Sequence, residues 1–487
     1  METKTVLLTL LSAATSLQGI GAEKNQGQRP NIIFILADDL GYGDLGCYPH
    51  LDKVTTPNLD KLAASGVRMT QAYAAFPYCS PTRASLLTGK FPQHLGVYSM
   101  KGGMVPGIGP YRKSFASTLH QFGYRTAWFG KWHLGYDLSN HPLNNGFDVA
   151  YGFLGGMHDY WKPNIGDHYY GGPYASHAYV FDGFKPVKKM DYLTDELTER
   201  AIAFIKESAT KQPFCIYLPY NAPHTPLQAP DGALLRRAKE GWDPIQAAWR
   251  AMIDVLDADI GKLMAALKKM DLDQNTLIIF TSDNGGQLES FNGGLRGMKG
   301  TVWEGGVRVP LVAVWPGKIP AGSTSGTICI SPDITATILA VAGASGKGDV
   351  YDGVDLMPFW TGEKKGDAHE TLMWTVLENN TGEAVTSNNA GMFAMRKGEW
   401  KIVQDKKKKI DALYNLKSDP GELTDLSKQE PQRKAELLRY GDQFLKGCPP
   451  KSDWTYSQST LGKDRQWRQE NAERCEKLLQ KDQNKQK

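Results

Sequence analysis

One short stretch of the chain places a cysteine in a setting suited to chemistry. Cys79 is followed by Pro81 and Arg83, and a Leu-Thr-Gly triplet at 87–89 closes the stretch. Proline suits the first turn of a helix, where free N–H groups favour negative charge. A helix beginning here would put Cys79 beside an anion-binding position, with Arg83 four residues later on the same face. A lone cysteine is more often a buried structural thiol. The residues elsewhere in the chain therefore have to decide whether Cys79 has a structural or a functional role.

Acidic residues follow two apolar runs that are typical of buried strands. Asp38 and Asp39 come directly after the run 32–37, and Asp283 and Asn284 closely follow the run 276–281. Ligands of open α/β sheets gather at the carboxyl ends of strands. Oxygen ligands alone suit a hard cation such as Ca2+ or Mg2+. One acid could instead cap a helix, and Asp-Asn-Gly-Gly is a common turn, but two matching strand ends favour a metal site.

Basic side chains form a third group. Lys131 and His133 lie at the end of the predicted strand 124–129, His224 lies in a turn between two prolines, and Lys299 lies in a glycine-rich loop. Taken singly, each is better interpreted as a surface lysine, a hydrogen-bonded histidine or an ordinary loop.

The segment 79–89 resembles, at every defined position, the type I sulfatase signature C-x-P-x-R-x-x-x-L-T-G. The acidic and basic groups also resemble that family's motifs in spacing and order, which favours a functional interpretation. The resemblance is strong over 29–316 and weaker afterwards, where 412–416 and 419–422 still look like the family's closing segment. It implies an alkaline phosphatase-like α/β fold: a large mixed β-sheet sandwiched by helices, with a smaller C-terminal antiparallel sheet plus helix.

The resemblance also implies a role for each residue. Cys79 would be converted to formylglycine (3-oxoalanine) by a formylglycine-generating or anaerobic sulfatase-maturating enzyme, and its hydrate would attack sulfur. Ca2+, with Mg2+ as an alternative, would be held by Asp38, Asp39, Cys79, Asp283 and Asn284. The implied catalytic residues are Cys79, Arg83, Lys131, His133, His224 and Lys299, of which Lys131, His224 and Lys299 also bind substrate. His224 or Lys299 would protonate the leaving alcohol and so offset the charge that develops on its oxygen.

The hydrophobic pattern predicts an α/β domain over 29–348. Near-continuous apolar runs at 31–36, 214–218, 276–281 and 309–314 predict strands of one sheet. Apolar residues at spacings of three and four between 245 and 270 predict an amphipathic helix. A C-terminal subdomain is predicted over 349–487, with an exposed strand or hairpin at 392–403, a turn-rich segment at 411–426 and a charged helical tail beyond 451.

Residues 1–22 have the layout of a secretory signal peptide, with cleavage expected after Ala22. The apolar run at 6–17 is short for a membrane span, so we predict a secreted or periplasmic protein without a membrane anchor. Six cysteines are too few for a disulfide framework; Cys448 and Cys475 could form one bridge, or every thiol could be free. The net charge of +4 gives no reason to invoke nucleic acid.

We therefore predict a sulfatase that hydrolyses sulfate monoesters, with a sulfated carbohydrate as the expected substrate; an aryl or lipid sulfatase would also fit. The loop 152–184 holds Tyr160, Trp161, Tyr169, Tyr170 and Tyr174, which could stack on sugars or pack in the core. His158 and Asp159 are candidate specificity contacts. Two alternatives stay open: a phosphodiesterase or phosphonate hydrolase with the same nucleophile and metal, and a catalytically silent protein that binds sulfated glycans.

Overall fold

The computed structural model describes residues 29–49, 54–98, 113–135, 138–165, 178–345, 351–377 and 391–449. The predicted signal peptide, Tyr169, Tyr170, Tyr174, Cys475 and the tail beyond 451 lie outside these residues. Within the described ranges, no helix combines the length and the apolar character needed to cross a membrane.

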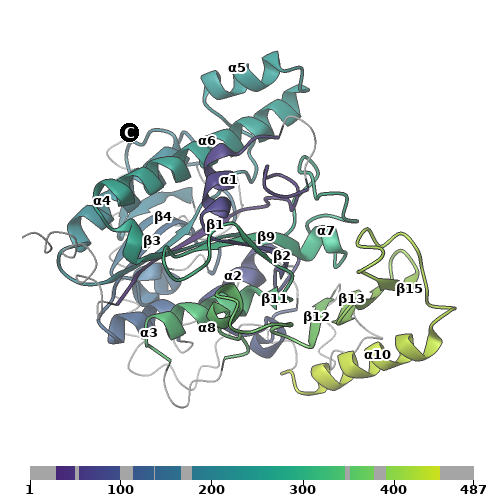
Figure 1. The fold of residues 1–487 in the computed structure, drawn as a ribbon. Helices are drawn as coiled ribbons and strands as arrows, with labels where there is room; N and C mark the ends of the chain where they lie inside the picture. Colours follow the sequence, from purple (N-terminus) through teal and green to yellow (C-terminus); the bar gives the residue numbers. More distant parts are fainter. Residues whose placement is uncertain are drawn as a thin grey trace, which may run out of the picture.

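The centre of the molecule is a mixed β-sheet that contains eleven of the described strands (Figure 1). Its order is β10-β2-β9-β8-β1-β7-β3-β4-β5-β6, with β11 beside β2. The strands are β1 (Asn31–Ala37), β2 (Val67–Tyr73), β3 (Arg125–Lys131), β4 (Val149–Phe153), β5 (Val180–Asp182), β6 (Lys185–Pro186), β7 (Phe214–Pro219), β8 (Thr276–Ser282), β9 (Arg308–Val314), β10 (Ser323–Ser325) and β11 (Cys329–Ile330). β8, β1, β7, β3 and β4 run parallel, whereas β9 is antiparallel to β2 and β8. All four predicted apolar runs are strands of this sheet, which confirms the α/β prediction.

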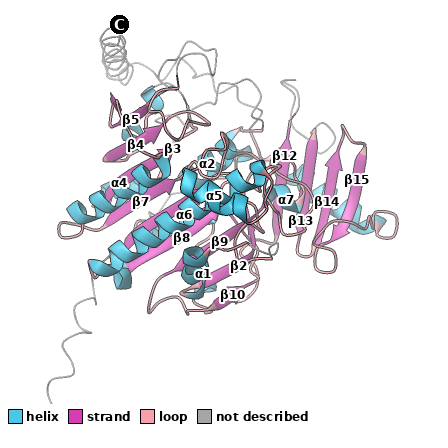
Figure 2. Ribbon diagram, turned by 90° about the horizontal axis from the view of Figure 1, so that it is seen from above, coloured by secondary structure: helices cyan, strands magenta, loops and turns pink. Residues whose placement is uncertain are grey.

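Helices cover both faces of the sheet (Figure 1, Figure 2). One face carries α1 (Pro57–Ala64), α4 (Leu193–Ser208) and α6 (Pro244–Lys269), with α5 (Asp231–Lys239) packed on α6; the other carries α2 (Cys79–Thr88), α3 (Phe115–Gln121) and α8 (Ser331–Val341). Short helices are α7 (Glu304–Val307) and α9 (Met357–Trp360), and single 3-10 turns span Gln93–Leu95, Leu138–Asn140, Pro142–Asn145 and Asp273–Asn275. The predicted helix at 245–270 is α6.

Strand β1 shows why its sequence is continuously apolar. Ile32, Phe34 and Leu36 belong to one hydrophobic core, and the alternate residues 33, 35 and 37 belong to the other. Successive side chains of a strand point to opposite faces, so a strand covered on both sides needs apolar residues throughout. The polar residues that follow β1 therefore stand at the rim of the sheet.

A second antiparallel sheet has the order β12-β13-β14-β15. It consists of β12 (Thr371–Val376), β13 (Met392–Lys397), β14 (Trp400–Asp405) and β15 (Ile410–Asn415), and α10 (Pro431–Lys446) packs on it. The hairpin predicted at 392–403 is present, but it is buried on both faces because Ala394 packs toward the large sheet while Met395 packs against α10. The turn-rich assignment of 411–426 is wrong for its first residues, which form β15 by pairing with β14.

A histidine joins α10 to the larger unit. His94 stacks on Phe444 with ring centroids 5.0 Å apart, and its Nδ1 lies 2.7 Å from a carboxylate oxygen of Asp352. The hydrogen bond with Asp352 raises the pKa of His94 to about 9, so the imidazole is a cation at neutral pH. Cys448, at the end of α10, has a free thiol, and its predicted partner Cys475 lies outside the described residues.

Candidate active site

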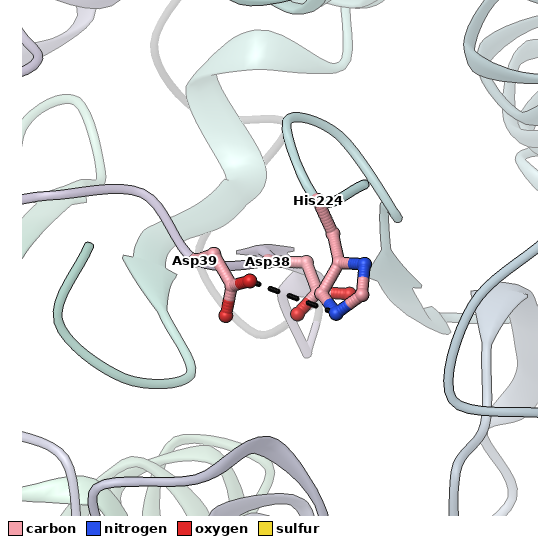
Figure 3. A group of neighbouring side chains, drawn as sticks. All are labelled: Asp38, Asp39 and His224. Carbon is pink, nitrogen blue, oxygen red and sulfur yellow. Dashed lines mark ion pairs between the residues drawn. The ribbon is translucent and has the colours of Figure 1, made fainter. Parts of the chain in front are cut away.

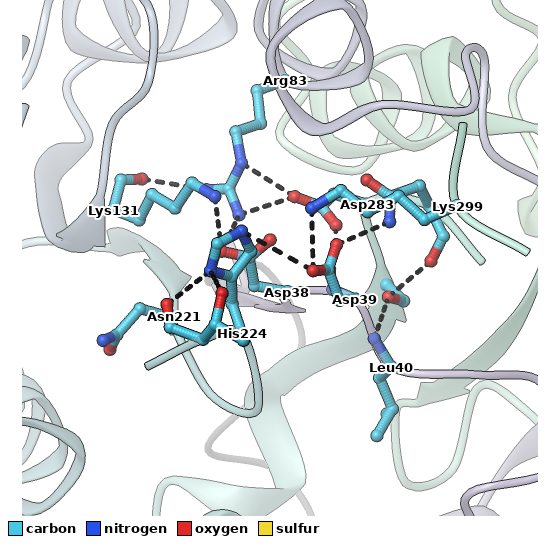
Figure 4. A network of polar contacts seen from close by, with 12 residues as sticks. Asp38, Asp39, Leu40, Arg83, Lys131, Asn221, His224, Asp283 and Lys299 are labelled. Carbon is cyan, nitrogen blue, oxygen red and sulfur yellow. Dashed lines mark hydrogen bonds and ion pairs between the residues drawn. The ribbon is translucent and has the colours of Figure 1, made fainter. Parts of the chain in front are cut away.

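Most of the predicted site residues meet where the central strands of the large sheet end. Figure 4 shows Asp38, Asp39, Arg83, Lys131, His224, Asp283 and Lys299 together. The four adjacent strands β8, β1, β7 and β3 point their carboxyl ends toward this region. Asp38 and Asp39 follow β1, Asp283 follows β8, Lys131 ends β3, and His224 lies in the loop after β7. Parallel pairing thus brings residues from distant parts of the chain into one cluster, as expected for an open α/β sheet.

The acidic residues form a compact, fully buried group. Asn284 donates its amide Nδ2 to Asp39 Oδ1 at 2.8 Å, and the backbone N–H of Asp39 donates to Asp283 Oδ1 at 3.3 Å. Ligand atoms of Asp38, Cys79 and Asp283 all lie within 4.8 Å of one another. A second such group joins Asp38 and Asp39 to His224 (Figure 3). Asp39 has a φ of +67°, a strained value for a residue with a side chain and one that recurs at functional sites.

Two oxygen atoms of this group fit a cation. Asp38 Oδ1 and Asn284 Oδ1 are buried, and neither has a hydrogen-bond partner among the described residues. A buried acceptor without a partner costs about 1–3 kcal/mol, so such atoms call for an explanation. Carboxylate and amide oxygens are the ligands that Ca2+ and Mg2+ prefer. The residues present therefore fit the predicted metal, and Asp38, Asp39, Asp283 and Asn284 would be its oxygen ligands.

Each carboxylate of the group also contacts a cationic side chain. Lys131 Nζ lies 2.5 Å from Asp38 Oδ2, and Lys299 Nζ lies 2.8 Å from Asp39 Oδ2. Burial raises the pKa of Asp39, but Lys299, His224 and Lys131 outweigh that effect and lower it to about 2. Asp39 is therefore ionised at neutral pH.

Arg83 ties the helix α2 to this network. Its Nε and Nη2 donate to Asp283 Oδ2 at 3.0 and 2.8 Å, and its Nη1 donates to the Lys131 carbonyl at 2.9 Å. Burial and the neighbouring Asp38 carboxylate raise the pKa of Asp283 to about 6 despite this pairing. Arg83 thus holds a carboxylate and the end of β3 in place.

Cys79 is the first residue of α2, as the position of Pro81 predicted. Its side chain is only 2% exposed. Burial raises the pKa of the Cys79 thiol, although Lys131 and Lys299 act in the opposite direction. Reactive cysteines have a lowered pKa, so the unmodified thiol is held in its weakly nucleophilic form.

The two histidines of the site are held differently. His224 Nδ1 lies 2.7 Å from the Thr225 carbonyl, which only accepts, so Nδ1 carries the proton. Its Nε2 is then an acceptor, 3.6 Å from Asp39 Oδ2. Burial and Lys131 lower the pKa of His224 to about 3, which keeps the ring neutral. His133 is buried at a φ of +57°, and burial together with Lys131 and Arg83 lowers its pKa as well.

The loop that carries Lys299 is fastened to the turn after β8. The backbone N–H of Lys299 donates to the Gly286 carbonyl at 2.9 Å, and Gly285 donates to Gly306 at 3.0 Å. A Cβ atom at Gly285 would lie 1.9 Å from the Gly305 carbonyl oxygen. The paired glycines of both segments therefore permit the backbone contact that fixes Lys299 beside Asp39.

The C-terminal sheet supports the same loop through a buried charge cluster that the sequence did not reveal. Lys401 Nζ of β14 lies 2.8 Å from Glu304 Oε1 and 3.0 Å from Glu422 Oε1, and all three side chains are inaccessible to solvent. Glu422 also accepts from the Glu304 backbone N–H at 2.7 Å, and its carbonyl accepts from Arg296 at 2.8 Å. Burial raises the pKa of Glu422 to about 7. The only sign of this cluster in the sequence is the resemblance of residues 419–422, Asp-Pro-Gly-Glu, to the closing segment of the family.

In the loop 152–184, some aromatic side chains are buried in the core and Trp161 is exposed. Tyr160 is fully buried, so of the two roles left open for it the structure shows packing in the core; its hydroxyl donates to the carbonyls of Asn221 and His224. His158 is 1% exposed, and its ring nitrogens lie near the carbonyls of Asp159 and Ala178. The structure does not bring His158 into the cluster, and its role as a substrate contact stays a prediction.

Comparison with known proteins agrees with this geometry. Residues 30–344 match the Sulfatase family, and residues 298–439 match the family described as N-sulphoglucosamine sulphohydrolase, C-terminal. The N-acetylgalactosamine-6-sulfatase of Canis lupus familiaris is 33% identical over 472 residues, covering 86% of this chain and 85% of that protein. The steryl-sulfatase of Homo sapiens is 32% identical over 434 residues, covering 72% and 73%. The solved structure of Ps i-CgsB in complex with k-i-k-neocarrahexaose superposes with a TM-score of 0.78 at 32% identity, covering 89% of this chain and 96% of that chain.

The fold and the matched relatives define an enzyme that hydrolyses esters of sulfuric acid. The chain belongs to the Sulfatase family. The predictions of a sulfatase and of an alkaline phosphatase-like fold are thereby confirmed. Members of this family generally use formylglycine and a divalent metal.

Proposed function

We propose that the chain releases inorganic sulfate from a sulfated carbohydrate, using formylglycine at position 79 and Ca2+. The observation that carries this proposal is that the Cys79 sulfur lies within 4.8 Å of carboxylate oxygens of Asp38 and Asp283, beside two buried oxygens that have no hydrogen-bond partner among the described residues. A carbohydrate substrate is supported by relatives named for N-acetylgalactosamine 6-sulfate and by a structural neighbour bound to neocarrahexaose.

The charge balance of the site supports an anionic substrate. The three carboxylates of Asp38, Asp39 and Asp283 are paired with three basic side chains, those of Arg83, Lys131 and Lys299. Without a metal, these six charges cancel. A bound divalent cation would leave a positive site that attracts a sulfate ester, because the buried surroundings screen charge poorly.

Each side chain of the site would have a separate role in cleaving the sulfate ester. Formylglycine and Ca2+ together would supply a hydrated aldehyde as nucleophile and a Lewis acid for the sulfate oxygens. Lys131 and Lys299 would bind those oxygens, and the free N–H groups at the start of α2 favour the same negative charge. Arg83 would hold Asp283 and the carbonyl of Lys131 in position through its three hydrogen bonds.

Lys299 is the better placed of the two predicted proton donors. Breaking the S–O bond leaves an alkoxide on the sugar, which needs one proton to leave as an alcohol. Burial lowers the pKa of Lys299, but the Cys79 sulfur and the carboxylates of Asp39 and Asp38 outweigh that effect and raise this pKa, so the ammonium group is present at neutral pH. His224 offers an acceptor nitrogen toward the site and therefore suits binding the substrate or taking a proton.

Mass spectrometry of the peptide that spans Cys79, combined with sulfate release, tests the proposal. We expect formylglycine in the active enzyme and release of sulfate from a sulfated saccharide. An intact cysteine in a fully active enzyme would contradict the assignment of formylglycine as the nucleophile. A phosphate ester with the same leaving group as a sulfate ester should be cleaved more slowly, and faster phosphate turnover would contradict the substrate class.

We further propose that the enzyme is exported and that its partner during maturation is a formylglycine-generating or anaerobic sulfatase-maturating enzyme. The proposed mature catalytic domain spans 29–348, and the C-terminal subdomain begins at 349. Amino-terminal sequencing of the exported protein should show a start at Glu23, which is the residue after the predicted cleavage site. A start at Met1 in exported protein would contradict the signal peptide.

A further inference from the structure

We infer that Trp161 is a stacking platform for a sugar ring of the substrate at the rim of the active site. The inference rests on the proposed carbohydrate sulfatase activity and names a residue that binds the sugar. Trp161 is 46% exposed, and no other tryptophan in the described ranges has an exposed side chain. A large indole surface left in water is unusual, and its flat face suits the apolar face of a pyranose ring.

Trp161 lies at the same edge of the sheet as the catalytic cluster. Strand β4 ends at Phe153, which pairs with Lys131 at the end of β3. The chain then passes beyond the sheet and returns through an antiparallel bridge between Asn164 and Tyr179, just before β5. The segment between Phe153 and Asn164, which contains Trp161, therefore stands above the carboxyl ends of the parallel strands.

Hydrogen bonds join this segment to the loop that carries His224. The hydroxyl of Tyr160 donates to the carbonyls of Asn221 and His224 at 2.7 and 2.8 Å. Since Trp161 is the next residue, its Cα lies only about 3.8 Å from that of Tyr160. The proposed platform is thus the direct chain neighbour of the residue that anchors His224.

Hydrogen bonds to its backbone and a contact of its ring hold Trp161 in place before substrate arrives. The carboxylate of Asp159 accepts from the backbone N–H groups of Trp161 and Lys162 at 2.8 and 2.9 Å, and from Gln228 Nε2 at 3.0 Å. The ring packs on Tyr192 at a centroid distance of 4.9 Å, and the Tyr192 hydroxyl donates to the Gln228 carbonyl at 2.8 Å. A platform held from two sides loses little entropy on binding. Asp159 therefore acts by positioning Trp161.

A second exposed apolar side chain lies in the loop that carries Lys299. Met298, which is 41% exposed, directly precedes Lys299. The sulfate-binding groups are charged and buried, whereas Trp161 and Met298 are apolar and exposed. This combination matches a sugar sulfate, in which a charged ester is attached to a ring with apolar faces.

The inference is tested with Trp161→Ala, Trp161→Phe and the matched control Phe122→Ala. Phe122 is 40% exposed but precedes β3, at the opposite edge of the sheet from the site. Values of kcat/KM are measured on 4-nitrophenyl sulfate and on sulfated oligosaccharides that include k-i-k-neocarrahexaose and N-acetylgalactosamine 6-sulfate oligomers.

For the oligosaccharide that the wild type cleaves fastest, Trp161→Ala should lower kcat/KM about five- to twentyfold, mainly through KM. Trp161→Phe should keep most of the activity, Phe122→Ala should resemble the wild type, and 4-nitrophenyl sulfate should be cleaved equally by all variants. Unchanged oligosaccharide cleavage by Trp161→Ala overturns the inference, as does an equal loss on both substrate types. A wild type that cleaves 4-nitrophenyl sulfate but no saccharide refutes the carbohydrate assignment itself, and the platform with it.

Discussion

Removing Lys401 should destabilise the whole enzyme, because its ammonium group lies buried between two carboxylates. Lys401→Met keeps the length of the side chain but leaves Glu304 and Glu422 without the cation that lies 2.8 and 3.0 Å from them. Breaking a buried ion pair by removing one partner costs about 3–5 kcal/mol. Since domains are typically stable by about 5–15 kcal/mol, this loss is a large share of the total.

Urea unfolding followed by tryptophan fluorescence measures the effect. A suitable control is Lys434→Met, since Lys434 pairs with Asp411, whose side chain is 51% exposed, and such a pair contributes about 0–1 kcal/mol. The double variant Lys401→Met/Glu422→Gln should be more stable than Lys401→Met, because it removes one of the two buried carboxyl groups while Glu304 keeps its ion pair with Arg308. A Lys401→Met variant within about 1 kcal/mol of the wild type would refute the reasoning, as would a double variant no more stable than the single one.

Three further predictions concern the metal, Lys299 and pH. A chelator should abolish sulfate release and lower the melting temperature, and Ca2+ should restore both; full activity in its presence would reject the metal site. Lys299→Ala should lower kcat/KM by about a hundredfold or more, since a positioned donor contributes mainly to the transition state. Its melting temperature, measured with Ca2+ present so that a cation still offsets the buried Asp39 carboxylate, should fall much less than that of Lys401→Met; an unfolded variant would show a structural role instead. The raised pKa of His94, about 9 against 6.5, means that its pairing with Asp352 stabilises the fold fully below pH 6.5 and progressively less as pH rises through 9. Unfolding of His94→Gln should therefore differ from that of the wild type at pH 6 and converge with it near pH 10; a difference independent of pH would contradict this.

The strand-end residues could be predicted because their positions follow from local pattern. A continuous apolar run indicates a strand covered on both faces, and the first polar residue after it lies at the edge of the sheet. Asp38 and Lys131 follow this rule and Asp283 comes one residue later, after Ser282, and parallel pairing of β8, β1, β7 and β3 brings them together. Cys79 could be placed at a helix start for an equally local reason, the proline two residues later.

Contacts between distant segments could not be predicted in this way. Lys401 and Glu304 are 97 residues apart, and neither the alternation of β14 nor the glycines near Glu304 indicates that they meet. In the loop after β4, the sequence has no period that would separate an inward ring from an outward one, so Tyr160 and Trp161 looked equivalent. The strand β15 was missed because its pairing with β14, a tertiary contact, outweighs the turn residues that follow it.

The charge cluster around Lys401 also bears on how the chain can be divided. A gene fragment ending at residue 348 would encode every member of the acidic and basic cluster, yet it would leave Glu304 without the ammonium group supplied by β14. The loop that carries Lys299 would lose Glu422, whose carbonyl holds Arg296, as its outer support. A replacement sheet without equivalents of Lys401 and Glu422 would remove these contacts, so recombination and domain-fusion experiments need to treat the two sheets as one unit.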